Sequence, residues 1–314
     1  MISRGTRLTI QTPGDYRFKR DVCSYGYFLL APNVWDPDRK TFTRPLNLSG
    51  GVATLTIAQP DSRKGSPLKI VADRALTRSE QAEAKRQIRR MLQLDDATVA
   101  DFHKVDKRWK RSGKARLFRS PTPFEDIIKT VTSCNVTWPS TVNMNKRLCE
   151  VVCPAFPTPK QLARKRPATL RARCSVGYRD QRIVDLARMA NRGELDLDRL
   201  EDASISDDDI YETLLALPGI GPYAGANIMS LLGRYSRLAI DTETIRHGKA
   251  VLGYKGGDPA IRKKLEKHYT PFGAHKFRSY WFEVWEFYES KQGPAHTWAP
   301  RAVVNAFTAS NLKK

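Results

Sequence analysis

The order of hydrophobic and polar positions divides the chain into a β-rich beginning and a helical remainder. Residues 52–58 (VATLTIA) and 68–72 (LKIVA) are β-prone runs, and the turn signals SGG and PDSRKGSP separate such runs. Before them, residues 15–30 (DYRFKRDVCSYGYFLL) predict a short helix that is capped by Asp15 and runs into a strand. We therefore expect a small antiparallel β region in residues 1–76.

From Thr77 onward the apolar positions recur at helical spacing. A capping-box pattern of Thr77 and Glu80 precedes the apolar residues Ala82, Ile88, Met91 and Leu92. Further helices are predicted at 122–135, 143–152, 167–173, 177–191, 206–217 and 275–289, whereas 136–141 (VTWPST) is typical of a loop. The predicted fold class is α+β and mostly α-helical, with a helical body at 77–296, a helix–hairpin–helix at 210–233 and a tail at 297–314.

The charge of the chain points to a polyanionic partner. Lys and Arg number 54 against 33 Asp and Glu, a net charge of +21, and nucleic acid is the most abundant polyanion in a cell. Part of the excess is concentrated in the basic segment 102–120, which we interpret as a phosphate-facing surface: Lys104, Lys107, Arg108, Lys110, Arg111, Lys114, Arg116 and Arg119. A solvated loop is the alternative for any single lysine, and charge alone also allows RNA binding.

The remaining composition bears on the cellular compartment. Five cysteines at irregular spacings are typical of reduced thiols in an intracellular protein. The sequence contains no apolar run long enough to span a membrane, and its first twenty residues lack the apolar region of a signal peptide. We therefore expect an intracellular location, in the cytoplasm or nucleoid of a bacterium or in the nucleus of a eukaryote.

The stretch 217–228 (LPGIGPYAGANI) carries the most specific signal. Gly219 and Gly221 allow a tight backbone turn, and Pro222 suits the first turn of a following helix. Bare glycine amides at a helix N-terminus form an anion site, so a DNA phosphate could approach the backbone there. The alternative is a helix corner whose glycines serve only packing.

As a whole, this stretch resembles the helix–hairpin–helix element of the DNA glycosylase superfamily. In that family an apolar run ending in Asp follows, which here is SRLAI and Asp241. The resemblance covers about residues 81–289 and is nearest to the 8-oxoguanine and 3-methyladenine (alkylbase) DNA glycosylases. It implies that Asp241 is the catalytic carboxylate, and that the carbonyls of Leu215, Leu217 and Ile220 hold a sodium or potassium ion.

Two departures from the family pattern narrow the predicted activity. Members that also cut the DNA strand carry a lysine where this chain has Tyr223, and tyrosine cannot form a Schiff base. No cysteine follows Cys174, so the four-cysteine iron–sulfur cluster of several relatives is expected to be absent and no cofactor to be required. Cys149 and Cys153 share a helix face, and two thiols without further ligands favour packing.

The resemblance also implies the residues that contact DNA. Asn135 and Arg179 match residues that bond the orphaned partner base, and Tyr178 matches the residue that wedges into the duplex. Ser140 stands where a third contact, an arginine, is missing. For the base pocket we expect contributions from Tyr223, Asn227, Glu243, Glu283 and Phe287, with Trp281 and Trp285 as aromatic walls. A core stripe is the alternative for the aromatic positions of residues 277–289.

These observations predict a DNA glycosylase of base excision repair. It would act as a monomer on double-stranded DNA, flip a damaged purine and hydrolyse its N-glycosidic bond with the help of Asp241, without a strand-cutting lysine. The alternative is a non-catalytic helix–hairpin–helix protein that binds DNA and senses lesions. Asp241 separates the two hypotheses, because a pure binder needs no carboxylate at that position.

Overall fold

A five-stranded antiparallel sheet occupies the N-terminal part of the chain in the computed structural model, which describes residues 5–61 and 63–298. Its strand order is β1-β5-β4-β3-β2. The strands are β1 (Arg7–Ile10), β2 (Val34–Asp36), β3 (Thr41–Leu48), β4 (Gly51–Ala58) and β5 (Leu68–Ala72). β4 and β5 coincide with the two runs that the sequence singles out, so the predicted antiparallel region is confirmed.

Alternation along the strands gives the sheet one buried and one open face. Phe42, Leu55 and Ile70 are almost fully buried, whereas Val52 and Val71 are exposed. This is the pattern of a sheet packed on one side only. Helix α2 (Arg78–Met91) contacts β3 and begins at the predicted capping box, in which Thr77 and Glu80 bond each other's backbone amides.

The segment 15–30 differs from its prediction. Helix α1 (Phe18–Val22) has Arg17 rather than Asp15 as its N-cap, and the 3-10 turn η1 (Gly26–Leu29) takes the place of the expected strand. The carboxylate of Asp15 instead accepts hydrogen bonds from the Arg116 guanidinium. Asp15, which the sequence predicted as the helix cap, therefore binds an arginine that lies 101 residues away in the chain.

Helices form the rest of the described chain, and the fold is α+β and mostly helical, as predicted. Helix α5 begins at Trp138, inside the stretch expected to be a loop. The elements are α3 (Val99–Val105), η2 (Lys107–Trp109), α4 (Pro123–Ser133), α5 (Trp138–Val151), α6 (Pro159–Ala163), α7 (Pro167–Cys174), η3 (Gly177–Arg179), α8 (Asp180–Arg192), α9 (Leu197–Glu201), α10 (Asp207–Leu215), α11 (Pro222–Leu231), α12 (Thr242–Ala250), α13 (Asp258–Tyr269), η4 (Thr270–His275), α14 (Lys276–Gln292) and η5 (Ala295–Thr297). None of these helices combines the length and apolar character needed to cross a membrane.

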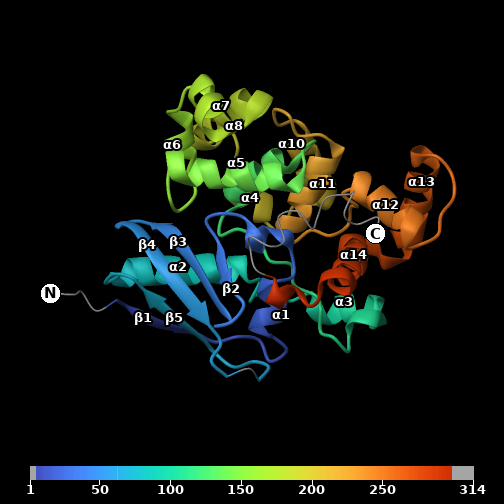
Figure 1. The fold of residues 1–314 in the computed structure, drawn as a ribbon, viewed down its shortest axis with the longest axis horizontal. Helices are drawn as coiled ribbons and strands as arrows, with labels where there is room; N and C mark the ends of the chain where they lie inside the picture. The colour runs from blue at the N-terminus through green and yellow to red at the C-terminus, as the bar shows by residue number, and fades with distance from the viewer. Residues whose placement is uncertain (1–4, 62, 299–314) are drawn as a thin grey trace.

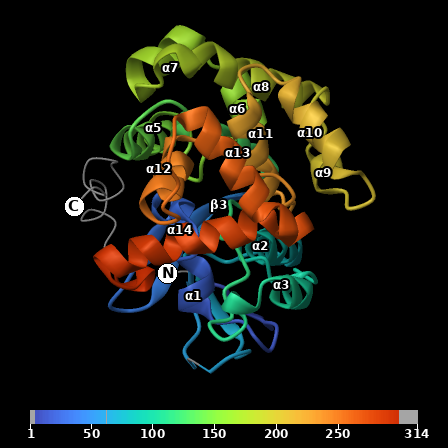
Figure 2. The ribbon, with the colours of Figure 1, turned by 90° about the vertical axis from the view of Figure 1, so that its right-hand side faces the viewer.

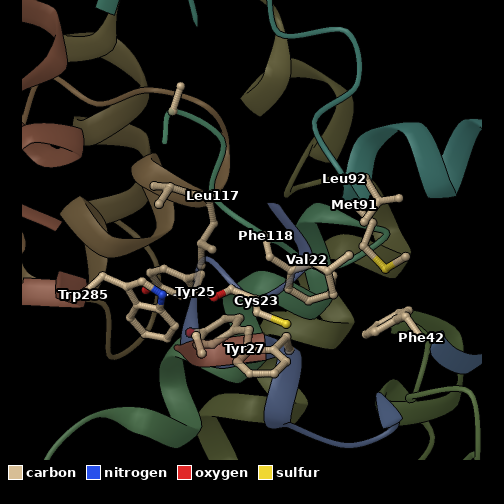
Figure 3. Close-up of a cluster of buried hydrophobic side chains, with 14 of the residues drawn as sticks. Val22, Cys23, Tyr25, Tyr27, Phe42, Met91, Leu92, Leu117, Phe118 and Trp285 are labelled. Atoms are coloured by element: carbon tan, nitrogen blue, oxygen red, sulfur yellow. Dashed lines mark hydrogen bonds between the residues drawn. The ribbon is translucent and has the colours of Figure 1, made fainter. Parts of the chain in front are cut away.

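Two hydrophobic cores hold the elements together. The first joins the sheet to α14 and includes the edge-on contact of Phe42 with Phe118, whose ring centroids are 5.3 Å apart. Figure 3 shows part of this core, with Trp285 beside Tyr25 and Cys23. The second core lies among α4, α5, α7, α8, α10 and α11. Figure 1 shows the sheet and these helices as separate layers, and Figure 2 shows α14 crossing in front of α1 and α2.

In the first core, the N-terminal segment that holds Cys23 and Ser24 packs against α14. The Trp281 indole donates to the Ser24 carbonyl at 2.8 Å, and the Trp285 indole donates to the Cys23 carbonyl at 3.0 Å. The N-terminal turn η1 is thereby fixed against the last long helix. The division at residues 76 and 296 stays a prediction, and most of the expected tail lies outside the described residues.

Candidate active site

The predicted helix–hairpin–helix is formed by α10 and α11. The Ser206 side chain accepts a hydrogen bond from the Asp209 amide at the start of α10, and Pro222 opens α11. Between the helices, Gly219 has φ +75°, a left-handed conformation that favours glycine. Gly221 is the N-cap of α11, and its φ of −101° is open to any residue. Only Gly219 therefore needs to be glycine for conformational reasons.

Two other predicted DNA contacts lie on exposed positions. The Arg182 side chain lies directly over Gly219 and its guanidinium lies 5.1 Å from the centroid of the Tyr178 ring. Tyr178 is 52% exposed, although most tyrosines of the described chain are buried, and the Arg179 guanidinium also lies 4.4 Å from its ring centroid. Asn135 follows α4 with φ +53° and an exposed side chain.

Arg179 is a correction to the sequence analysis. Its side chain is only 5% exposed and donates to the main-chain carbonyls of Val131 and Cys134. The guanidinium thus ties η3 to the end of α4. It supports the surface that carries Tyr178 and Asn135 instead of reaching toward a partner base.

The three carbonyls proposed for a cation lie at the hairpin. The Leu217 oxygen accepts a hydrogen bond from the Ile220 amide at 3.2 Å, and the main-chain oxygens at helix ends lack intrahelical partners. Carbonyl oxygens are suitable ligands for hard cations, and the sodium or potassium site at Leu215, Leu217 and Ile220 stays a prediction. In the described ranges, no group of three or more His, Cys, Asp or Glu side chains could hold a metal.

A cavity of about 560 Å³ opens beside α11 and α12. Nineteen residues from η1, the α4–α5 junction, α11, α12 and α14 line it. Nine of them are aromatic, namely Tyr25, Tyr27, Trp138, Tyr223, Phe277, Tyr280, Trp281, Trp285 and Tyr288. A volume of this size with aromatic walls suits a small planar ligand.

Asp241 lies in the wall of this cavity and caps α12. Its Oδ1 accepts hydrogen bonds from the Thr244 amide and the Thr244 hydroxyl, both at 2.9 Å. No Lys, Arg or His of the described chain forms an ion pair with it. Burial raises the pKa of the Asp241 carboxyl above its usual 3.8, an effect that the Thr244 hydrogen bonds only partly offset. The site therefore holds a carboxylate that is fixed in place and has no cationic partner.

Tyr223 and Asn227 both line the cavity, on α11. Burial, and then the nearby Asp241 carboxylate, raise the pKa of Tyr223 well above 10, so it is a neutral hydroxyl. Asn227 is 4% exposed; its oxygen accepts from the Tyr25 hydroxyl at 2.6 Å, and its amide donates to Thr130 at 3.0 Å. Asn227 thus holds Tyr25 in place with its own polar atoms.

Of Glu243, Glu283 and Phe287, only Glu243 lines the cavity. Its carboxylate pairs with Arg246, whose guanidinium lies 4.3 Å above the Phe287 ring. Phe287 itself does not line the cavity, although we expected it to contribute to the base pocket. The Phe287 ring instead packs against Arg246, and Arg246 pairs with Glu243.

Glu283 is also wrongly assigned to the pocket. Its carboxylate accepts from the Tyr269 hydroxyl, lies 3.1 Å from His247 Nε2 and pairs with Arg108. None of these four residues lines the cavity, so Glu283 lies on a side of α14 that does not face it. The pocket side of α14 instead presents Trp281 and Trp285, which the sequence analysis offered as aromatic walls.

Sequence reasoning missed the contribution of η1. Tyr25, Gly26 and Tyr27 line the cavity, and the Tyr25 and Trp281 ring centroids are 4.5 Å apart. A side chain at Gly26 would come within 3.2 Å of the Trp138 ring, so a glycine lets this indole lie over the turn. The signal was present in the SYGYF pattern, where glycine separates two tyrosines.

The basic segment 102–120 is a further correction. Arg116 is buried and pairs with Asp15, Arg119 pairs with Glu201, and Lys114 pairs with Glu289. Arg108 pairs with Asp106 and Glu283, and Lys104 pairs with Asp101. Of the eight cations only Lys107, Lys110 and Arg111 are exposed and form no ion pair with the described residues. Five of the eight cations therefore have a carboxylate partner within the molecule.

Comparison of the sequence finds no matching protein family and no matching curated protein. Comparison of the structure finds several similar folds. The 3-methyladenine DNA glycosylase from Archaeoglobus fulgidus is similar with a TM-score of 0.66 and 16% identity, over 89% of this chain and 98% of that one. MBOgg1, solved with a low-affinity DNA ligand, is similar with a TM-score of 0.66 and 16% identity, over 90% and 97%.

The apo form of the Clostridium acetobutylicum 8-oxoguanine glycosylase/lyase is similar with a TM-score of 0.65 and 15% identity, over 90% of this chain and 98% of that one. The chain thus has the fold of the helix–hairpin–helix DNA glycosylases, as the resemblance of residues 217–228 and Asp241 predicted. Within that class it has the overall architecture of both the 8-oxoguanine and the 3-methyladenine enzymes.

Proposed function

We propose that the protein is a DNA glycosylase that removes a damaged purine by hydrolysis. The observation that carries the proposal is Asp241, a half-buried carboxylate in the wall of an aromatic cavity that forms no ion pair with any of the described residues. The cavity lies beside a hairpin whose glycine amides suit a phosphate. The similar structures of DNA glycosylases, some of them solved with DNA, agree with this proposal.

The aromatic cavity suits a base that has left the DNA stack. Taking a base out of the duplex costs a few kcal/mol, and stacking on aromatic side chains offsets part of that cost. Trp281 and Tyr25 offer such faces, and the cavity volume of about 560 Å³ is sufficient for a purine. The exposed Tyr178 ring would fill the space that the base leaves in the duplex.

Asp241 would then act on the sugar. As the bond between sugar and base breaks, positive charge develops on the sugar, and a carboxylate held by Thr244 stabilises that charge without having to reorganise. The same carboxylate would orient the attacking water and accept its proton. Its raised pKa makes it a better base than an ordinary aspartate.

We propose hydrolysis without strand cleavage. A lyase reaction needs an amine that forms a Schiff base with the sugar, and none of the residues that line the cavity is a lysine. The position where strand-cutting members carry one holds Tyr223, a neutral hydroxyl. The expected product is therefore an intact strand with one abasic site.

One observation favours a non-catalytic DNA-binding protein as the second candidate. Asp241 caps α12 through Thr244, and that role alone would account for an aspartate at this position. In this case the cavity would hold a flipped base without releasing it.

A panel of duplexes tests the proposal, each with one altered base: 8-oxoguanine, hypoxanthine, an alkylated purine, uracil, or adenine opposite 8-oxoguanine. Strand breakage is measured with and without hot alkali, and borohydride traps any Schiff base. We expect breakage of one duplex only after alkali and no trapped adduct. An adduct would overturn the hydrolytic assignment. Tight binding without release from any duplex would favour the second candidate.

A further inference from the structure

A second basic segment differs from the one at 102–120. Residues 151–179 contain no Asp or Glu, although they supply seven cations, and they form the end of α5 together with α6, α7 and η3. Two of the seven are used inside the protein: Arg171 pairs with Asp180, and Arg179 donates to main-chain carbonyls. The side chains of the other five form no ion pair with the described residues, and all are at least partly exposed: Lys160, Arg164, Lys165, Arg166 and Arg173.

Four cations meet in a groove of about 340 Å³ between α6 and α8. Its lining contains no carboxylate and no aromatic ring, and consists of Lys160, Ala163, Arg164, Arg188, Asn191 and Arg192. Arg188 lies 3.7 Å from Asp185, and Arg192 lies 2.6 Å from Glu194, in pairs whose side chains are 36–54% exposed. Exposed ion pairs of this kind contribute at most about 1 kcal/mol, so a phosphate can replace their carboxylates.

The positive charges at this groove repel one another. Lys160 and Arg164 are four residues apart at α6, a spacing at which like charges on a helix destabilise it. Lys165 and Arg166 follow directly and add two more positive charges, and no described carboxylate pairs with any of the four. A partner with many regularly spaced negative charges would relieve this repulsion. The DNA duplex is such a partner, with one phosphate charge per about 1.7 Å of its axis.

Helix α8 connects the groove to the hairpin. Near its start, Arg182 lies over Gly219 of the hairpin and beside the exposed Tyr178 ring, and at its end Arg192 lines the groove. The two arginines are ten residues apart, which on a helix is about 15 Å, or the length of about four base pairs. In Figure 1, α6 and α8 lie at the top, away from α12 and α14, which line the base cavity. The groove is therefore separate from the cavity but within reach of a duplex that binds the hairpin.

From these observations we propose that the α6–α8 groove binds the phosphate backbone of double-stranded DNA, a few base pairs beyond the hairpin on the same duplex. Contacts of Lys and Arg with phosphates hold a duplex without reading its sequence. A single-stranded nucleic acid is a poorer match, because its bases stack on aromatic side chains and none lines the groove. The groove would therefore anchor the undamaged DNA that flanks the site of base release.

The first test measures affinity as a function of duplex length. Two duplexes carry a stable abasic analogue, so that binding is measured without base release, and extend about four or about fifteen base pairs to either side of it. We expect the wild type to bind the long duplex about 10- to 100-fold more tightly at about 0.1 M salt, because the groove adds phosphate contacts. Lys160→Gln, Arg164→Gln and Arg192→Gln together should remove most of this preference and reduce the slope of log K against log salt by about two to three.

The control variant carries Lys107→Gln, Lys110→Gln and Arg111→Gln, which remove the same charge at exposed positions of the basic segment that form no ion pair with the described residues. It should keep the length preference, and melting temperatures check that both variants fold. An equal loss in the control would show that only net charge matters, and an unchanged preference in the groove variant would show that the groove does not contact DNA. Either result overturns the inference, as would a groove variant that loses affinity for single-stranded RNA alone.

The second test counts duplexes per protein by sedimentation, and we expect a 1:1 complex with the short duplex. A second short duplex that binds the wild type but not the groove variant would overturn the placement on the same duplex. Base release from a short damaged duplex should be equal in the wild type and the groove variant. Length-dependent binding that the groove variant loses, without base release from any duplex, would contradict the proposed function alone. Base release without that length dependence would contradict this inference alone.

Discussion

The basic segment 102–120 and the cavity beside α12 differ in whether their charged side chains form ion pairs. In the segment, cations find carboxylates that lie far away in the sequence, such as Asp15 for Arg116 and Glu289 for Lys114. In the cavity, Asp241 is half-buried and has no such partner among the described residues. Burial alone would raise the pKa of both aspartates, but Arg116 lowers the pKa of Asp15 below 3.8, whereas that of Asp241 stays raised.

The difference shows where function resides in a highly basic chain. A cluster of cations in the sequence need not face a ligand, because folding can use those charges as structural ion pairs. A buried carboxylate without a cation costs free energy of folding, and such strain is most often retained at a functional site. The unpaired Asp241 is therefore more informative than the eight cations of the basic segment.

The largest expected effect comes from removing the unpaired charge. Asp241→Asn should slow base release by about 10²–10³, because the neutral amide no longer stabilises positive charge on the sugar. Asparagine is also a good N-cap, so α12 should remain folded. Single-turnover release measures the effect, with duplex affinity and melting temperature as controls. A variant that releases base at nearly the wild-type rate would contradict the account.

Removal of a paired charge should instead affect stability. Arg116→Ala should lower the free energy of unfolding by about 2–4 kcal/mol, because Arg116 is buried and also donates to the Gln93 carbonyl. The duplex affinity of the folded protein should not change. Lys110→Ala, at an exposed position of the same segment, is the control and should change neither stability nor fold. A stable Arg116→Ala protein with weakened duplex binding would show that the segment does face DNA.

The hairpin offers a matched pair of glycines. In Gly219→Ala the new methyl group would lie 2.4 Å from Arg182 Cδ, and the residue would keep φ +75°. We expect about tenfold weaker duplex binding, since a strained turn of 1–2 kcal/mol displaces the amides. Gly221→Ala meets no atom within 4 Å and should bind nearly as the wild type does. Equal affinities measured by titration would argue against a phosphate contact at Gly219.

The smallest expected effect is a shift in the pH dependence of base release. Asp241 must be ionised to act, and its raised pKa means that base release should already decline at a pH above 3.8, by about tenfold per pH unit below that pKa. The pKa of Asp15 is shifted in the opposite direction, below 3.8. The ionised Asp15 therefore stabilises the fold above pH 3.8, and this stability is lost as the pH falls through the pKa of the folded state. A pH–rate profile and a pH–melting profile separate the two. A rate that stays constant down to pH 4 would contradict the assignment of Asp241.

The features that sequence predicted well depend on local backbone constraints. The hairpin follows from glycine and proline within five residues, and the start of α2 follows from a capping box that spans four. Both depend on neighbours in the chain, so they can be read from a single sequence. Asp241 was found differently, through the resemblance to the DNA glycosylases, in which an apolar run after the hairpin ends in Asp.

The features that sequence predicted poorly depend on tertiary contacts. On α14, residues 277, 280, 281, 285 and 288 line the cavity, whereas Glu283 and Phe287 do not. The helical period fixes which residues share a face, but α14 is buried on most sides, so the period could not show which face meets the cavity. Arg179 likewise donates to carbonyls more than forty residues away.

The most direct test of the central claim is to detect the products. A duplex with one damaged purine from the panel is incubated with the protein in ¹⁸O-labelled water, and mass spectrometry follows both the small molecules and the strand. The account predicts free purine and an intact strand whose abasic sugar carries one ¹⁸O. A duplex that stays bound with its base attached would contradict the account and leave the protein as a binder of damaged DNA.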